Sequence, residues 1–131
     1  MDKKNKILIV EDEKPMVLAL KDKFEREGFV VSEASDGVEG LAKAFAEKPD
    51  IILLDILMPK MDGLATLKHL RAENDYGKAV PVILLTNLSA DKEEIIQTVA
   101  ETGPAYYIVK SSLTIQEVVD KVRDLLANPA S

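Results

Sequence analysis

Five polar side chains with the chemistry for metal binding or phosphoryl transfer follow short apolar runs in this sequence. Glu11 and Asp12 follow "ILIV", Asp55 ends "IILLD", Thr86 ends "VPVILLT" and Lys110 ends "YYIVK". If these runs are parallel strands, their carboxyl ends meet at one edge of a sheet. We therefore expect three carboxylates, a hydroxyl and an ammonium to converge there from distant parts of the chain.

Three carboxylates at close quarters repel one another unless a cation joins them or one is protonated. Hard oxygen ligands with room for water suit Mg²⁺ or Mn²⁺, which a phosphate can complete. A carboxylate beside such a cation can act as a nucleophile toward a phosphoryl group and form an aspartyl-phosphate. Lys110 and Thr86 would then neutralise and hydrogen-bond the phosphoryl oxygens. No general base is needed, because an ordinary aspartate is ionised at neutral pH.

The elements that must position these groups alternate along the chain. Continuously apolar runs predict strands buried on both faces, at 7–10, 29–34, 51–55, 80–86 and 106–110. Helical spacing of apolar residues covers 17–24, 38–45, 64–72, 92–101 and 115–126. The pattern predicts an α/β fold of five βα units, a doubly wound parallel sheet in the order 2-1-3-4-5. This is a flavodoxin-like three-layer sandwich.

Local sequence also predicts the helix ends. Asp62 precedes the segment 64–72, and we assign it to N-capping rather than to chemistry. Asp36 and Thr114 each precede an acidic residue by three positions, as in a capping box. Glu13 we assign to the solvated acidic run that opens the first helix.

Length and composition restrict the classes of protein. A chain of 131 residues predicts one domain, residues 1–131 with a core at about 6–127. A net charge of -6 argues against a nucleic-acid-binding surface, and the absence of cysteine excludes disulfides and thiolate metal sites. No apolar segment is long enough for a membrane span, and the run 7–10 is too short for a signal peptide. We expect a cytoplasmic protein.

Four motifs in order, "ILIVEDE", "LLDILMPKMDG", "ILLT" and "YYIVK", resemble those of response-regulator receiver domains of two-component signalling, chemotaxis regulators included. The resemblance runs from Lys6 to about Ala127. It implies that Asp55 is the phosphoacceptor and that four groups hold the metal: Glu11, Asp12, Asp55 and the backbone carbonyl of Leu57. It also implies that Thr86 and Lys110 bind the phosphoryl group and that Tyr107 is an aromatic switch residue. Pro59 and Gly63 match the loop that shapes the site.

The resemblance implies a signalling function. A histidine kinase or phosphotransfer protein would phosphorylate Asp55, and the surface formed by 92–101, 106–110 and 115–126 would change its affinity for a protein partner. The chain would lose its own phosphoryl group slowly and would not be a turnover enzyme. Whether it acts alone or is a part of a larger regulator with an output domain stays open.

Four positions depart from the commonest family pattern. Ser111 replaces a proline after the lysine, which puts a cis peptide there in doubt, and Asn87 is bulkier than the usual small residue. Leu57 and Leu88 flank the phosphoryl position and cannot orient water, so we expect slow hydrolysis.

Two other classes of protein fit the sequence less well. A phosphatase of the haloacid dehalogenase type would want an aspartate in place of Leu57. A flavin- or nucleotide-binding module would want glycine or hydroxyl residues where "EDEKP" stands.

Overall fold

The computed structural model of this chain describes residues 4–86, 97, 100, 101, 103, 106–110 and 114–127. Its sheet has five parallel strands in the order β2-β1-β3-β4-β5, which confirms the predicted α/β fold and strand order. The strands are β1 Lys6–Val10, β2 Val30–Ala34, β3 Ile51–Asp55, β4 Val82–Thr86 and β5 Tyr106–Val109. Each begins and ends within two residues of its predicted apolar run.

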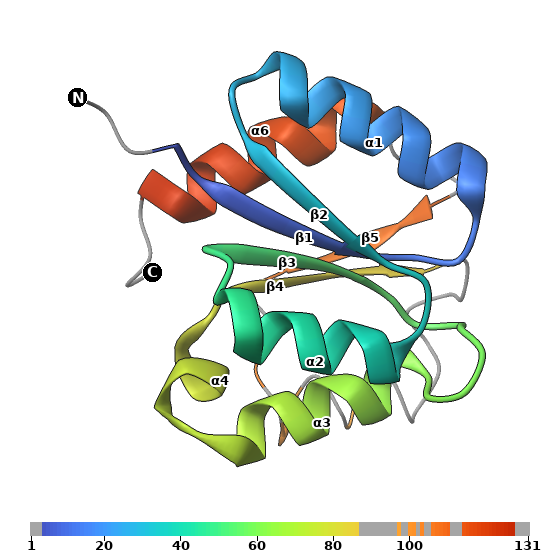
Figure 1. The fold of residues 1–131 in the computed structure, drawn as a ribbon, viewed down its shortest axis with the longest axis vertical. Coiled ribbons are helices and arrows are strands. Elements are labelled where there is room, and N and C mark those ends of the chain that lie inside the picture. The colour runs from blue at the N-terminus through green and yellow to red at the C-terminus, as the bar shows by residue number, and fades with distance from the viewer. Residues whose placement is uncertain are drawn as a thin grey trace.

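Helices cover both faces of the sheet and make three layers (Figure 1). The helices are α1 Lys14–Arg26, α2 Gly37–Glu47, α3 Gly63–Glu73, α4 Asp75–Ala79 and α6 Ile115–Ala127. Helices α1 and α6 lie on one face, and α2, α3 and α4 lie on the other (Figure 1). Most of the predicted helix at 92–101 lies outside the described residues, although 97, 100 and 101 are helical.

The short helix α4 was not predicted from the sequence. The Asn74 side chain caps it by accepting a hydrogen bond of 2.8 Å from the Gly77 N–H. The Tyr76 hydroxyl ties it to the loop before β3 by donating to the Pro49 carbonyl at 2.7 Å. Gly77 gives no apolar side chain to a helical face, so the periodicity of this five-residue segment is too weak to reveal it.

The central strand β3 is buried along its whole length, as its unbroken run of apolar residues predicts. Its alternate residues enter two separate cores. Ile52 and Leu54 pack with residues of α2 and α3, whereas Ile51 and Leu53 pack with residues of α1 and α6. The strand therefore holds Asp55 between two helical layers, at the point where the apolar environment ends.

Helix α3 begins directly after the loop that follows β3. The Asp62 carboxylate accepts a hydrogen bond of 2.8 Å from the Ala65 N–H, which confirms the predicted N-cap. Asp36 caps α2 through the Glu39 N–H, and Thr114 caps α6 through the Glu117 N–H. The second half of the predicted capping box is displaced by one residue, because Glu39 accepts from Ser35 N–H instead of Asp36 N–H.

The cap on α3 gives a stability prediction. We expect Asp62→Ala to lower the free energy of unfolding by about 1 kcal/mol, because the Ala65 N–H loses its acceptor. Asp62→Asn keeps a side-chain oxygen in the same place and should cost much less. Urea unfolding followed by circular dichroism measures both. Equal losses for the two variants would contradict the capping role.

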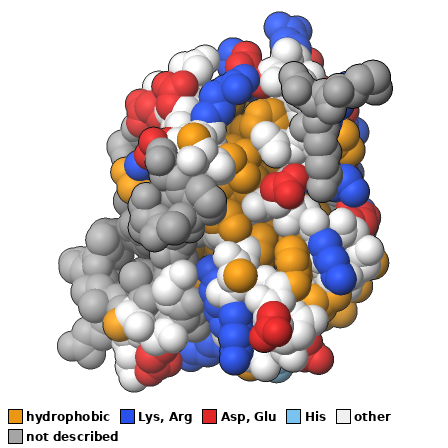
Figure 2. Space-filling model, turned by 90° about the vertical axis from the view of Figure 1, so that its left-hand side faces the viewer, with side chains coloured by type: hydrophobic (Ala, Val, Ile, Leu, Met, Phe, Trp, Pro, Cys, Tyr) orange, Lys and Arg blue, Asp and Glu red, His pale blue; other side chains and the backbone are white. Residues whose placement is uncertain are grey.

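The amino ends of the parallel strands lie on one side of the molecule, and the site residues follow the carboxyl ends on the opposite side. Figure 2 shows this side, where apolar side chains form a strip between basic and acidic groups. Among the described residues, no helix has the length and hydrophobicity required to cross a bilayer.

Candidate functional site

The register of the sheet brings the predicted site residues to one edge. Val10 lies opposite Leu54, so Glu11 follows β1 at the level of Asp55. Thr86 pairs with Val109, so Lys110 follows β5 directly beside the end of β4. The side chains of Thr86 and Tyr107 lie outside the described part of the structure, and so do Asn87, Leu88 and Ser111. Roles that depend on them stay predictions.

Glu11, Asp12 and Asp55 form the predicted carboxylate cluster. One oxygen from each lies within 4.8 Å of the others. Glu11 and Asp55 are buried, whereas Asp12 is exposed, so the cluster opens to solvent on one side. The buried Glu11 Oε1 makes an ion pair with the Lys110 ammonium at 2.5 Å.

This donor set fits a magnesium ion. The three carboxylates are hard oxygen ligands, and the side of Asp12 leaves room for water. Among the described residues, these three acids form the one group of three or more acidic or histidine side chains that lie close enough together to share a cation. The Leu57 carbonyl follows β3 as the resemblance requires, but its part in metal binding stays a prediction.

Lys110 compensates the negative charge of this cluster in the metal-free protein. Its ammonium lies 2.5 Å from Glu11 Oε1, 2.8 Å from Glu13 Oε1 and 3.2 Å from Asp55 Oδ2. The Lys110 side chain is only 5% exposed, so its ion pairs with the buried Glu11 and Asp55 are little screened by water. The sequence predicted the meeting of Lys110 with Asp55 and Glu11, and the structure brings them together.

The charges change the acidities of both groups. Burial and the neighbouring Glu11 together raise the pKa of Asp55 to about 7, although Lys110 acts to lower it. Burial lowers the pKa of Lys110, but the carboxylates of Glu11, Glu13 and Asp55 together raise it above its ordinary value. The ordinary pKa of a free aspartate, which the argument from the sequence used, is therefore not the pKa of this buried carboxyl.

Glu13 belongs to the site, which the sequence analysis missed. We assigned it to a solvated acidic run, yet its carboxylate accepts a hydrogen bond of 2.8 Å from the Lys110 ammonium. Its backbone N–H donates to Glu11 Oε2 at 3.1 Å. An acid at the N-cap of the helix that follows Glu11 and Asp12 was the available sign in the sequence.

Comparison with known proteins identifies the family. The model of the response regulator receiver domain matches residues 7–123. The chain belongs to the response-regulator receiver family. Receiver domains are signalling modules of two-component systems, in agreement with the resemblance read from the motifs.

Relatives of this receiver domain include longer regulators. It is 37% identical over 121 residues to the Bacillus subtilis alkaline phosphatase synthesis transcriptional regulatory protein PhoP, covering 92% of this chain and 48% of PhoP. The receiver domain thus spans about half the length of this curated relative. A CheY-like receiver domain from Methanospirillum hungatei superposes with a TM-score of 0.87 at 26% identity, covering 97% of both chains.

A second solved structure bears on the metal. The receiver domain of the Pseudomonas aeruginosa sensor histidine kinase PA1611 was solved with magnesium coordinated in its active site cleft. It superposes with a TM-score of 0.83 at 26% identity and covers 96% of this chain and 100% of that one. A magnesium site in a relative of this fold is compatible with the carboxylate cluster of Glu11, Asp12 and Asp55.

Backbone hydrogen bonds hold the loop that follows Asp55 against the end of β3. The Gly63 N–H donates to the Ile56 carbonyl at 2.7 Å, and the Met61 N–H donates to the Pro59 carbonyl at 2.7 Å. Lys60 adopts a positive φ of 67°, which closes the turn at a cost for a residue with a side chain. These contacts fold the chain back on the end of β3 and fix the direction from which Asp55 can be approached.

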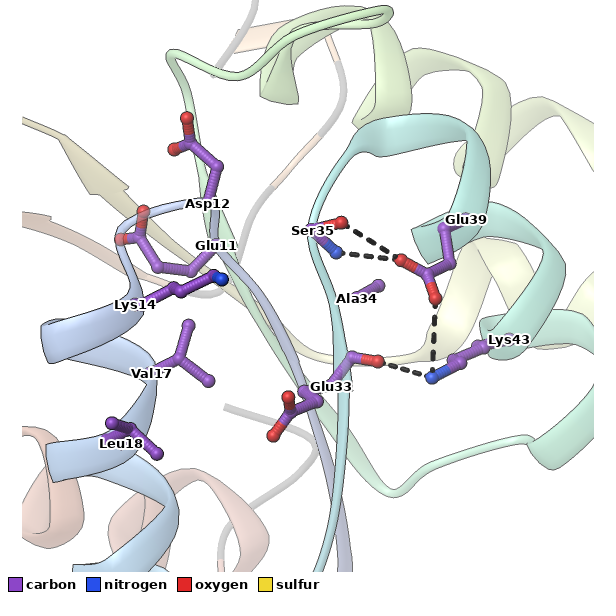
Figure 3. Close-up of a pocket in the computed structure, with 10 residues that line it drawn as sticks. All are labelled: Glu11, Asp12, Lys14, Val17, Leu18, Glu33, Ala34, Ser35, Glu39 and Lys43. Atoms are coloured by element: carbon purple, nitrogen blue, oxygen red, sulfur yellow. Dashed lines mark hydrogen bonds and ion pairs between the residues drawn. The ribbon is translucent and has the colours of Figure 1, made fainter.

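An open pocket of about 350 Å³ adjoins the carboxylate cluster of the receiver domain, and Glu11, Asp12, Val17 and Ser35 are among its lining residues. Figure 3 shows it between the start of α1 and the end of β2. Glu39 Oε1 accepts from the Ser35 N–H at 2.9 Å, and its other oxygen pairs with Lys43 on the far wall (Figure 3). Glu11 and Asp12 are thus the members of the carboxylate cluster that border this pocket.

Proposed function

We propose that this receiver domain accepts a phosphoryl group on Asp55 in a magnesium-dependent reaction. The observation that carries the proposal is the position of the Asp55 carboxylate. It lies buried at the end of β3, 3.2 Å from the Lys110 ammonium and within 4.8 Å of ligand oxygens of Glu11 and Asp12. A nucleophilic oxygen, a cation-binding set and a fixed positive charge therefore lie in one place.

In the proposed reaction, an Asp55 oxygen attacks the phosphorus atom of a phosphohistidine. The P–O bond forms as the P–N bond breaks, and the electron pair of the broken bond leaves with the imidazole ring. Glu11, Asp12, Asp55 and the Leu57 carbonyl would hold the metal, which neutralises developing charge on the phosphoryl oxygens. Lys110 supplies a second positive charge, and Thr86 a hydrogen bond once Asp55 is phosphorylated.

The proposed donor is a histidine kinase or a phosphotransfer protein in the cytoplasm. The added oxygens attract Lys110 and Thr86, and the surface formed by 92–101, β5 and α6 changes its affinity for a downstream protein. Tyr107 takes part in this change. The domain itself contacts neither nucleic acid nor membrane, since its net charge is -6. It acts either alone or within a longer regulator such as its relatives.

Labelling with acetyl phosphate tests the proposal. With Mg²⁺ present, the protein should gain one phosphoryl group, and peptide mapping should locate it on Asp55. A chelator should prevent labelling, because the carboxylate cluster then lacks the charge that the incoming phosphate requires. Failure to label with Mg²⁺, or a label on a different residue, would contradict the proposal.

A further inference from the structure

Glu13 precedes helix α1, but its side chain does not cap that helix. It is the N-cap of α1, with extended backbone angles of φ -82° and ψ 103°, yet its side chain makes no capping hydrogen bond. The carboxylate instead reaches the Lys110 ammonium at 2.8 Å. The helix thus forgoes a stabilising interaction typical of N-caps, and the side chain is used for a contact with the site.

Glu13 also differs from the other partners of Lys110. The side chains of Glu11 and Asp55 are 0% and 4% exposed, whereas that of Glu13 is 53% exposed. Glu11 and Asp55 belong to the cation-binding cluster, and Glu13 does not. An ammonium has three N–H donors, and in this structure three carboxylates surround it.

We propose that Glu13 is a positioning residue that holds Lys110 in the unphosphorylated arrangement and competes with the phosphoryl group for its ammonium. This inference rests on the proposed phosphorylation of Asp55. While Glu13 occupies one donor of Lys110, that donor is unavailable to a phosphoryl oxygen on Asp55.

Removing the charge of Glu13 should therefore speed phosphorylation. Glu13→Gln should raise the initial rate of labelling by acetyl phosphate with Mg²⁺ by about twofold to fivefold, the upper part of the range of a half-exposed ion pair. Glu25→Gln is the matched control, since Glu25 is exposed on the same helix and its substitution changes net charge equally. It should leave the rate unchanged.

Glu13→Asp separates positioning from helix stability. The shorter acid suits the N-cap angles and can accept from the Met16 N–H, so this variant should be at least as stable as the wild type. It should nevertheless label faster, as Glu13→Gln does, because its carboxylate no longer reaches Lys110. A purely structural role would give slower labelling with lower stability, or no change.

The final test combines Glu13→Gln with Lys110→Met and adds a readout on the metal-free protein. In the Lys110→Met background, Glu13→Gln should no longer change the labelling rate. In metal-free wild type, the NMR signal of the Lys110 side chain should shift upon Glu13→Gln and stay in place upon Glu25→Gln.

If wild type labels on Asp55 but Glu13→Gln labels no faster than Glu25→Gln, the inference fails alone. If wild type does not label, the proposed function fails and the inference with it.

Discussion

Asp55→Asn is expected to abolish phosphoryl labelling by acetyl phosphate, whereas Asp62→Asn, in the same loop, is expected to keep it. An amide oxygen is a poor nucleophile, and the amide also removes one of the three carboxylates that fit the cation. Asp62 faces α3, where it accepts from the Ala65 N–H, and takes no part in the cluster. Intact-mass measurement after incubation with Mg²⁺ and the donor distinguishes the variants. Undiminished labelling of Asp55→Asn would reject Asp55 as the acceptor.

The same substitution should stabilise the metal-free protein at neutral pH. Asp55 has its pKa raised to about 7 in the folded chain by burial and by Glu11, against about 3.9 for a free aspartate. Between these values the folded protein binds more protons at this group than the unfolded chain does, so stability falls as pH rises. The stability present below about pH 4 is lost by pH 7, on the order of 3 kcal/mol for a shift of this size.

Urea unfolding with a chelator at pH 5 and pH 7.5 measures this dependence. The wild type should lose stability over the interval, and Asp55→Asn should lose much less, because the asparagine does not titrate. Adding Mg²⁺ to the wild type at the higher pH should restore stability by binding the folded form. Parallel pH curves for the two proteins would show that Asp55 is not the group responsible.

The sequence alone was sufficient to predict the order of the strands in the sheet. It was also sufficient to predict that site residues far apart in the chain meet at one edge of that sheet. Five apolar runs at regular spacing allow few topologies, and the end of each parallel strand faces the same edge. The positions of Glu11, Asp55 and Lys110 followed from that rule, as did the capping role of Asp62, which depends on local backbone geometry alone.

The interactions that the sequence could not predict depend on distances between separate elements. Glu13 looked like one more acid at the start of a helix, and only the folded structure brings the start of α1 to Lys110 at the end of β5. The raised pKa of Asp55 likewise depends on its burial and on the closeness of Glu11, neither of which is a property of the strand's own residues. The charge interactions within the site therefore became visible only in the three-dimensional structure.

The close approach of α3 to the end of β3 depends on Gly63, the first residue of that helix. A Cβ atom there would lie 2.1 Å from the Asp55 carbonyl oxygen and 2.8 Å from the Ile56 Cα. Both neighbours are backbone atoms, so neither can move by changing a rotamer. Any larger residue must displace either the helix or the strand end that carries Asp55.

Gly63→Ala should therefore impair both stability and chemistry, whereas Gly77→Ala should impair stability alone. A Cβ on Gly77 would lie 1.9 Å from the Leu70 carbonyl oxygen, a comparable backbone clash in α4, away from the carboxylate cluster. We expect each variant to lose about 3 kcal/mol of unfolding free energy. Among folded molecules, Gly63→Ala should label with acetyl phosphate more slowly by on the order of 100-fold, because Asp55 is displaced from Lys110 and the cation-binding oxygens. Gly77→Ala should label at the wild-type rate. Equal labelling rates for the two variants would mean that the α3 contact supports the fold without setting the position of Asp55.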